Sequence, residues 1–87
     1  MYVVLVYDVE QKRVAKMLKL CRQYLHWVQN SVFEGEITER DLEALKAKAK
    51  MLMGEGGSVL VYSMQDGSWL NREVLGQEKN KLDNFIE

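Results

Sequence analysis

Apolar side chains recur at helical spacing in two segments of the chain. The first segment, residues 12–25, has an apolar face made of Val14, Leu18, Cys21 and Leu25. Its opposite face is basic, made of Lys12, Lys16 and Lys19 and flanked by Arg13 and Arg22. No acidic residue interrupts this segment. We therefore predict an amphipathic helix with one basic face.

The second helical segment, residues 39–53, carries signals at both ends. Thr38 followed three residues later by Asp41 is typical of a helix start, and the glycines of 54–57 end the pattern. Acids early and lysines late in the segment suit the helix dipole. Its predicted apolar face consists of Leu42, Leu45, Ala49 and Leu52.

Short runs of β-branched and aromatic residues predict the strands. The densest run, residues 2–7, is followed by a charged break, which indicates a central strand buried on both faces. The further predicted strands are residues 27–33, 58–64 and 72–75. A turn at 65–68 separates the last two, and a polar connector at 76–81 precedes a short edge strand at 82–86.

The predicted order is strand, helix, strand, helix, strand, strand. This order is compatible with an α+β, ferredoxin-like sandwich, an antiparallel sheet with two helices on one face, formed by residues 1–87 as a single domain. The other face of so apolar a sheet would be exposed, and packing two sheets together would bury it. At 87 residues, one core is also close to the lower limit of stability. Both arguments predict a homodimer.

Composition limits the kinds of function that the chain could have. The net charge of −1, from 12 basic and 13 acidic residues, means that phosphate binding would need a local basic patch. Cys21 is the single cysteine, so no disulfide forms within the chain, and its apolar setting indicates a buried thiol. The apolar start of the chain lacks a basic region and a cleavage site and is too short to span a membrane, which leads us to expect a cytoplasmic protein.

Asp8 is the strongest candidate for chemistry. It directly follows the first predicted strand, where its backbone would be held in place; a turn or helix-capping role is the alternative. One carboxylate is too little for a Mg²⁺ site, but two copies of Asp8 across a dimer axis would suffice. Such a pair would repel, which favours a bound cation or a shared proton. A cation there would polarise a phosphate and lower the pKa of a bound water.

The basic helix face is the second candidate. Lys12, Arg13, Lys16 and Lys19 are spaced cations of the kind that bind a nucleic-acid backbone, with an ordinary solvated face as the alternative. Among the other polar and aromatic residues, His26 is a general-base candidate without a matched partner. Trp27, Trp69 and Phe33 have side chains that stack on bases, and core or dimer packing is the alternative for each.

Three strings of residues together resemble one family. They are YVVLVYDV at residues 2–9, KRVAK at 12–16 and VQNSVFEG at 28–35, with further agreement at 58–62 and 73–76. The resemblance is to the small CRISPR-associated adaptation proteins, the "Cas two" endoribonuclease family, and it covers nearly the whole chain. The chain departs from the family in its short 9–12 loop and in Trp27, where many members have a basic residue. Both departures bear on base contacts and substrate preference.

The resemblance implies a ferredoxin-like fold and a homodimer joined through its sheets, with the segment 77–87 reaching the partner subunit. It implies a role in spacer acquisition with the "Cas one" integrase and DNA, and a metal-dependent nuclease activity on RNA or double-stranded DNA. Asp8 matches the family's metal-binding aspartate, and Arg13 a basic position close after it. Ser31 and Phe33 match a motif near the interface, and Tyr7 would support the site.

Three functions remain open from the sequence. The first is a Mg²⁺-dependent endonuclease with Asp8 as its catalytic and metal-binding residue. The second is a non-catalytic dimeric scaffold that binds DNA and bridges the integrase, for which the basic helix matters and Asp8 need not. The third is a toxin ribonuclease of the VapD type, which would have no integrase partner.

Overall fold

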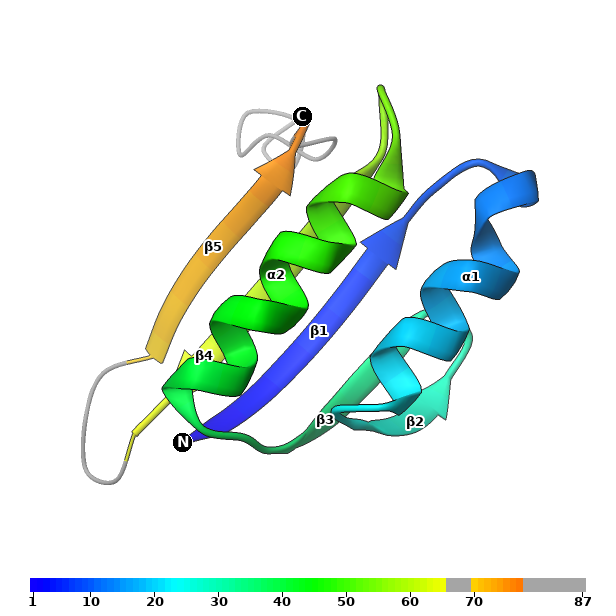
Figure 1. Ribbon diagram of the computed structural model, residues 1–87. Helices are drawn as coiled ribbons and strands as arrows, with labels where there is room; N and C mark the ends of the chain where they lie inside the picture. The colour runs from blue at the N-terminus through cyan, green and yellow to red at the C-terminus, as the bar shows by residue number, and fades with distance from the viewer. Residues whose placement is uncertain (66–69, 78–87) are drawn as a thin grey trace, which may run out of the picture.

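The computed structural model describes residues 1–65 and 70–77. Their elements are β1 (Tyr2–Asp8), α1 (Gln11–Arg22), β2 (His26–Gln29), β3 (Val32–Glu36), α2 (Glu39–Met53), β4 (Ser58–Met64) and β5 (Leu70–Gly76). The strands form one antiparallel sheet in the order β2-β3-β1-β4-β5, and both helices lie on one face of it (Figure 1). The predicted α+β sandwich with two helices on one face is confirmed.

The single strand predicted over residues 27–33 was wrong. It is a hairpin, in which β2 and β3 pair with each other across a turn at Asn30 and Ser31. Asn30 has a φ of 47°, a left-handed conformation that asparagine tolerates better than most residues. The extra strand completes the order β-α-β-β-α-β of the ferredoxin-like plan, and β5 extends the sheet beyond β4.

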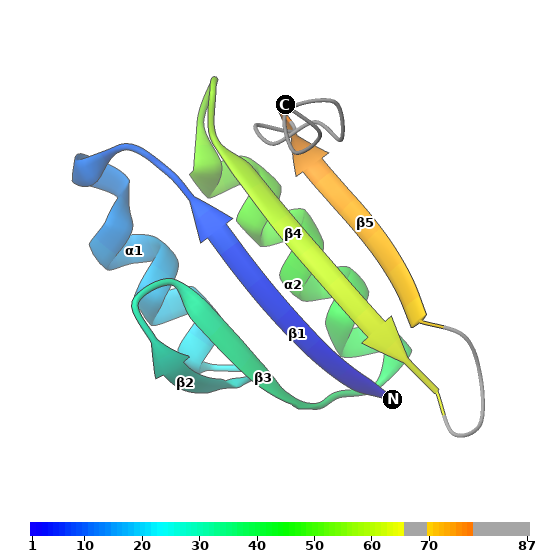
Figure 2. The ribbon, with the colours of Figure 1, turned by 180° about the vertical axis from the view of Figure 1, so that it is seen from behind.

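The strand β1 is central, as predicted, but in the single chain it is buried on one face only. Its side chains alternate, so that Val3, Leu5 and Tyr7 are buried beneath the helices. Those of Val4 and Val6 are half-buried on the opposite side, which Figure 2 shows without helix cover. We call this side the open face.

The two helices differ in how well the apolar pattern predicted them. Helix α1 ends at Arg22 instead of residue 25, and its buried residues are Met17, Leu20 and Cys21. Of the predicted face, Val14 and Leu18 are only half-buried, because the helix is rotated slightly towards Met17 and Leu20. Burial of Cys21 is confirmed, and it raises the pKa of the thiol to about 12, which makes the thiol a poor nucleophile at neutral pH.

Helix α2 has the predicted bounds and the predicted start. The Thr38 hydroxyl accepts a hydrogen bond of 3.1 Å from the Asp41 backbone N–H, as the sequence signal indicated. Its buried residues are Leu42, Leu45, Ala49 and Met53. Leu52, which we predicted on this face, is half-buried.

The C-terminal part of the chain is only partly described. Strand β5 runs over Leu70–Gly76 and is longer than the predicted 72–75. The predicted turn at 65–68 and edge strand at 82–86 fall largely or wholly outside the described residues, as does most of the 77–87 segment. No helix within residues 1–65 and 70–77 is long and apolar enough to cross a membrane.

Candidate functional site

Asp8 lies at the C-terminal end of β1, where three elements meet. It is exposed, and its backbone is held by pairing with Ser58 of β4. Beside it is a hollow of about 310 Å³, which we call the Asp8 hollow; its lining residues are Tyr7, Asp8, Val9, Val14, Asn30 and Ser31. The end of β1, the start of α1 and the β2–β3 turn thus surround the carboxylate.

The hairpin turn brings a second strand end to Asp8. The backbone N–H of Tyr7 donates a hydrogen bond of 3.2 Å to the Ser31 carbonyl, which fixes the turn beside β1. Two of the predicted site residues, Asp8 and Ser31, are therefore neighbours in space. Asn30 was missed in the sequence, although an asparagine before a serine in a β-branched run is itself a turn signal.

Tyr7 and Phe33 belong to the core of the single chain. Tyr7 is 5% exposed and Phe33 is fully buried, and their rings stack with centroids 6.0 Å apart. Burial raises the pKa of the Tyr7 hydroxyl, with a smaller effect of the Cys21 thiol. In the single chain both side chains pack on the helix side of the sheet, and the predicted place of Phe33 near a dimer interface stays a prediction. Their predicted role in supporting the end of β1 stays a prediction.

Arg13 has an intrachain role that the sequence did not reveal. Its Nε donates a hydrogen bond of 2.8 Å to Glu10 Oε1, and a guanidinium nitrogen donates one of 3.2 Å to the Leu52 carbonyl of α2. The hydrogen bond from Arg13, followed by the charge of Lys12, lowers the pKa of Glu10. Gly54 has a φ of 73°, and a Cβ there would come within 2.5 Å of the Arg13 side chain. Arg13 therefore fastens the start of α1 to the end of α2.

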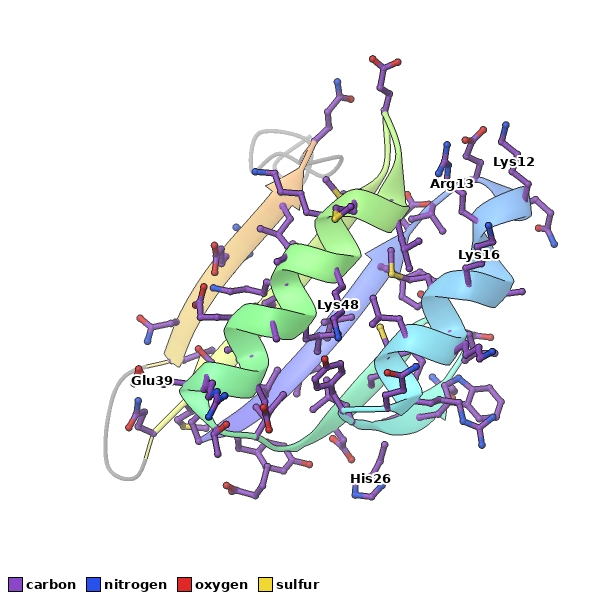
Figure 3. All side chains as sticks on the ribbon, in the orientation of Figure 1. Lys12, Arg13, Lys16, His26, Glu39 and Lys48 are labelled. Carbon is purple, nitrogen blue, oxygen red and sulfur yellow. The ribbon has the colours of Figure 1, made fainter. Side chains whose placement is uncertain are left out.

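The three predicted lysines of α1 lie on the outside of the helix. Lys12, Lys16 and Lys19 are all exposed, and we call them the helix cations. A fourth lysine joins them from α2, since Lys48 lies with Lys16 and Lys19 around a shallow groove of about 450 Å³. Figure 3 shows Lys48 on the same side of the molecule as Lys12, Arg13 and Lys16. The sequence did not predict Lys48, because its place depends on the packing of α1 on α2.

Lys48 is held in place by an aromatic side chain. Its Nζ donates a hydrogen bond of 2.8 Å to the Tyr24 hydroxyl and lies 5.4 Å from the centre of the Tyr24 ring. His26, in contrast, is exposed on the edge strand β2 and lies away from Lys12 and Lys16 in Figure 3. Its backbone pairs with Glu34, on the open face, so the structure does not join it to the Asp8 hollow.

The donor atoms at the Asp8 hollow fit a hard cation only in part. A carboxylate, a side-chain amide and a hydroxyl all present oxygen, the element that Mg²⁺ prefers. Asp8 is the one acid among them. Within residues 1–65 and 70–77, no group of three or more His, Cys, Asp or Glu side chains could hold a metal ion. A Mg²⁺ site at Asp8 would therefore need a carboxylate beyond those that the described residues of one chain bring together.

The fold and this site define a class: a small ferredoxin-like protein with an aspartate at the end of its first strand and a basic helix beside it. The family model described as "CRISPR associated protein Cas2" matches residues 1–72. The chain belongs to this family, and the predicted family resemblance is confirmed.

Full-length relatives agree with this assignment. The chain is 51% identical to a protein of Thermotoga maritima over 99% of each chain, and 46% identical to one of Dictyoglomus turgidum over 99% of this chain and 100% of that one. Both relatives are named CRISPR-associated endoribonuclease Cas2, which supports the expected endonuclease.

Solved structures agree as well. A crystal structure of a Cas2 protein matches with a TM-score of 0.69 and 36% identity, over 94% of this chain and 93% of that one. That of Streptococcus pyogenes Cas2 matches with a TM-score of 0.68 and 32% identity, over 76% of this chain and 88% of that one.

Proposed function

We propose that this protein is a metal-dependent endonuclease that acts as a homodimer on RNA or double-stranded DNA during CRISPR spacer acquisition. The observation that carries the proposal is the position of Asp8, an exposed carboxylate at a fixed strand end beside an oxygen-lined hollow, in a family with relatives named endoribonucleases. Such a protein would act in the cytoplasm.

The open face supports the homodimer. Half-buried or exposed apolar residues run across its central strands, among them Val4, Val6, Leu60, Tyr62 and Met64. Covering such a face with its own copy removes apolar surface from water without a second kind of partner.

Charges on the open face favour one orientation of the two copies. A single row of paired residues crosses the sheet, made of Glu34, Val4, Tyr62 and Arg72. A two-fold axis parallel to the strands, between β1 and β4, would set Glu34 of each copy opposite Arg72 of the other. An axis across the strands would set Glu34 against Glu34. The favoured axis also brings both Asp8 side chains to the same end of the dimer.

The residues of the Asp8 hollow have separate roles in this proposal. Two Asp8 carboxylates would hold the divalent cation, which supplies charge stabilisation to the phosphate and a more acidic bound water. Ser31 and Asn30 would donate hydrogen bonds to the sugar or phosphate next to the cleaved bond. The helix cations would hold the flanking backbone, while Arg13 keeps the start of α1 in position.

The Asp8→Asn substitution tests the nuclease. End-labelled single-stranded RNA and double-stranded DNA are incubated with and without Mg²⁺, with each variant confirmed to have the oligomeric state of the unmodified protein. We expect Mg²⁺-dependent cleavage of one substrate, reduced by about two orders of magnitude or more in Asp8→Asn, as for groups that stabilise transition-state charge directly. Asp41→Asn, the same change at an exposed aspartate of α2, is the matched control and should cleave normally.

Two outcomes would favour the scaffold over a nuclease that depends on Asp8. If neither protein cleaves, or if Asp8→Asn cleaves as the unmodified protein does, the metal mechanism at Asp8 is excluded. The helix cations and Lys48 favour this second function, because a surface of exposed lysines binds backbone without any catalytic group. The protein would then bind DNA and bridge the "Cas one" integrase. The toxin alternative gains no support from relatives that are named CRISPR-associated.

A further inference from the structure

Trp27 has a large aromatic side chain that is about half exposed to solvent and is nevertheless held in one orientation. It lies on the edge strand β2 and is 52% exposed. Its indole Nε1–H donates a hydrogen bond of 2.9 Å to the Asn30 carbonyl, within the same hairpin. A side chain already held in one orientation loses less conformational entropy when a ligand binds its face. The indole is therefore both accessible and preorganised.

Neither core packing nor the sheet-to-sheet dimer accounts for this exposure. The backbone of Trp27 pairs with that of Phe33, and directly paired residues point to the same side of a sheet. Phe33 is fully buried on the helix-covered side, so Trp27 lies on that side too, at the edge, and away from the open face. Core packing was an alternative for both residues in the sequence, and the structure shows it for Phe33 but not for Trp27.

The indole is fixed to the turn that forms one wall of the Asp8 hollow. Its acceptor, Asn30, lines the hollow with Asp8 and Ser31. Helix α1, which carries the helix cations, packs on the same half of the sheet as β2 (Figure 1). A strand whose backbone follows the helix cations would pass both an aromatic face and a carboxylate. Spaced cations beside an exposed aromatic ring are the combination by which proteins bind unpaired nucleic acid.

We propose that Trp27 is a stacking platform for an unpaired nucleobase of the substrate strand. The ligand class is single-stranded RNA or DNA, or an unpaired segment of a duplex. The inference rests on the proposed function in that it takes the ligand to be nucleic acid, and it adds that the strand has at least one unstacked base beside the Asp8 hollow. Base stacking on an aromatic ring is sequence-tolerant, so the platform selects unpaired strands without selecting a particular base.

The test measures binding apart from cleavage. A 12-residue fluorescein-labelled single-stranded RNA and a blunt duplex of equal length are titrated in EDTA, with anisotropy as the readout. Trp27→Leu should weaken binding of the single strand roughly 5- to 100-fold and leave duplex binding nearly unchanged. Trp27→Phe, which keeps an aromatic face, should retain most of the affinity. Leu70→Ala, at an exposed apolar residue on the opposite edge strand, is the matched control and should bind normally.

Trp27 fluorescence gives a second readout, in which Trp27 itself is left unchanged. In a Trp69→Phe protein, in which Trp27 is the remaining tryptophan, single-stranded RNA should quench the emission, and the same backbone with abasic sites should not. Equal binding by Trp27→Leu and the unmodified protein, equal losses for single strand and duplex, or quenching by the abasic strand would each overturn the platform.

The two proposals fail separately. Loss of single-strand affinity in Trp27→Leu together with full cleavage by Asp8→Asn would support the platform and exclude the metal mechanism at Asp8. Normal single-strand binding by Trp27→Leu, together with loss of cleavage in Asp8→Asn, would exclude the platform and support the nuclease.

Discussion

The two faces of the sheet are built from the same strands and differ in what covers them. On β1, Val3, Leu5 and Tyr7 face the helices and are at most 5% exposed, while Val4 and Val6 face the other way and are half-buried. Residue type does not separate the two sets, since both are β-branched or large and apolar. What separates them is that both helix crossovers fall on one side. The covered face stabilises the single chain, and the open face is available to a second copy and, at its end, to chemistry.

The largest effect should come from equal truncations on the two faces. Leu5 on the covered face is fully buried, and Leu60 on the open face is half-buried. Leu5→Ala should lower the free energy of unfolding by about 2–5 kcal/mol, and Leu60→Ala by about 1 kcal/mol or less. The measurement is urea unfolding at protein concentrations low enough that the midpoint no longer depends on concentration. Equal losses would mean that the open face is as much a part of the single-chain core as the covered face.

The second effect concerns the open face alone. Leu60→Lys places a charge where the second copy would pack, and we expect dimer dissociation to become at least about 100-fold more favourable, or roughly 2.7 kcal/mol. Sedimentation equilibrium measures it. Met51→Lys, the same kind of change at an 83% exposed apolar residue of α2, is the control and should leave the dimer intact. A dimer that survives Leu60→Lys would exclude packing through the open face.

A charge exchange then tests the orientation of the two copies. Glu34→Arg and Arg72→Glu should each weaken the dimer, because each sets like charges opposite one another under the proposed axis. The double variant restores opposite charges and should recover most of the loss. If the double variant is as weak as the sum of the single ones, the two-fold axis does not lie parallel to the strands.

This difference between the faces explains which parts of the structure the sequence could predict. Alternation and helical spacing predicted the strands and α2 well, because each reports which side of one element is buried. The β2–β3 turn was missed because the three polar residues 29–31 are flanked by Val28 and Val32, and the whole segment is compatible with the alternation of one long strand. The antiparallel pairing of β2 with β3 shows that the chain reverses there.

In the candidate site, too, the residues that could be predicted are those whose place depends on a single element. Asp8 and the helix cations were predictable because each depends on one element and its end. Asn30, Lys48 and the fixed orientation of Trp27 depend on contacts between residues that meet only in the folded chain, such as the hydrogen bond from the indole to the turn. Arg13 was predicted as a phosphate ligand from its place in the basic face, and its hydrogen bond to the Leu52 carbonyl could not be foreseen from α1 alone.

The smallest predicted effect lies where helix cover ends. On β5 the covered side carries Glu73, and Lys46 of α2 reaches it with an Nζ–Oε1 distance of 2.8 Å and contacts Glu43 at 2.9 Å. The hydrogen bond to Glu73 raises the pKa of Lys46, against the opposing effect of desolvation. Because both acids are half or more exposed, solvent screens the pair, and Lys46→Met should cost about 1 kcal/mol or less at pH 7.

The pH dependence of that loss separates charge from packing. A lysine pKa raised above its unfolded value of 10.5 gives a stabilisation that is fully present below pH 10.5 and is lost as the pH rises through the folded pKa. The difference in unfolding free energy between the unmodified protein and Lys46→Met should therefore shrink above pH 10.5, while Lys50→Met, an exposed lysine of the same helix, serves as control. A difference that persists would show that the uncharged amine of Lys46 still stabilises through its hydrogen bonds, because methionine retains the aliphatic stem. Helix α2 would then be joined to β5 independently of charge, and the contrast with the open face would be sharper than the helix cover alone implies.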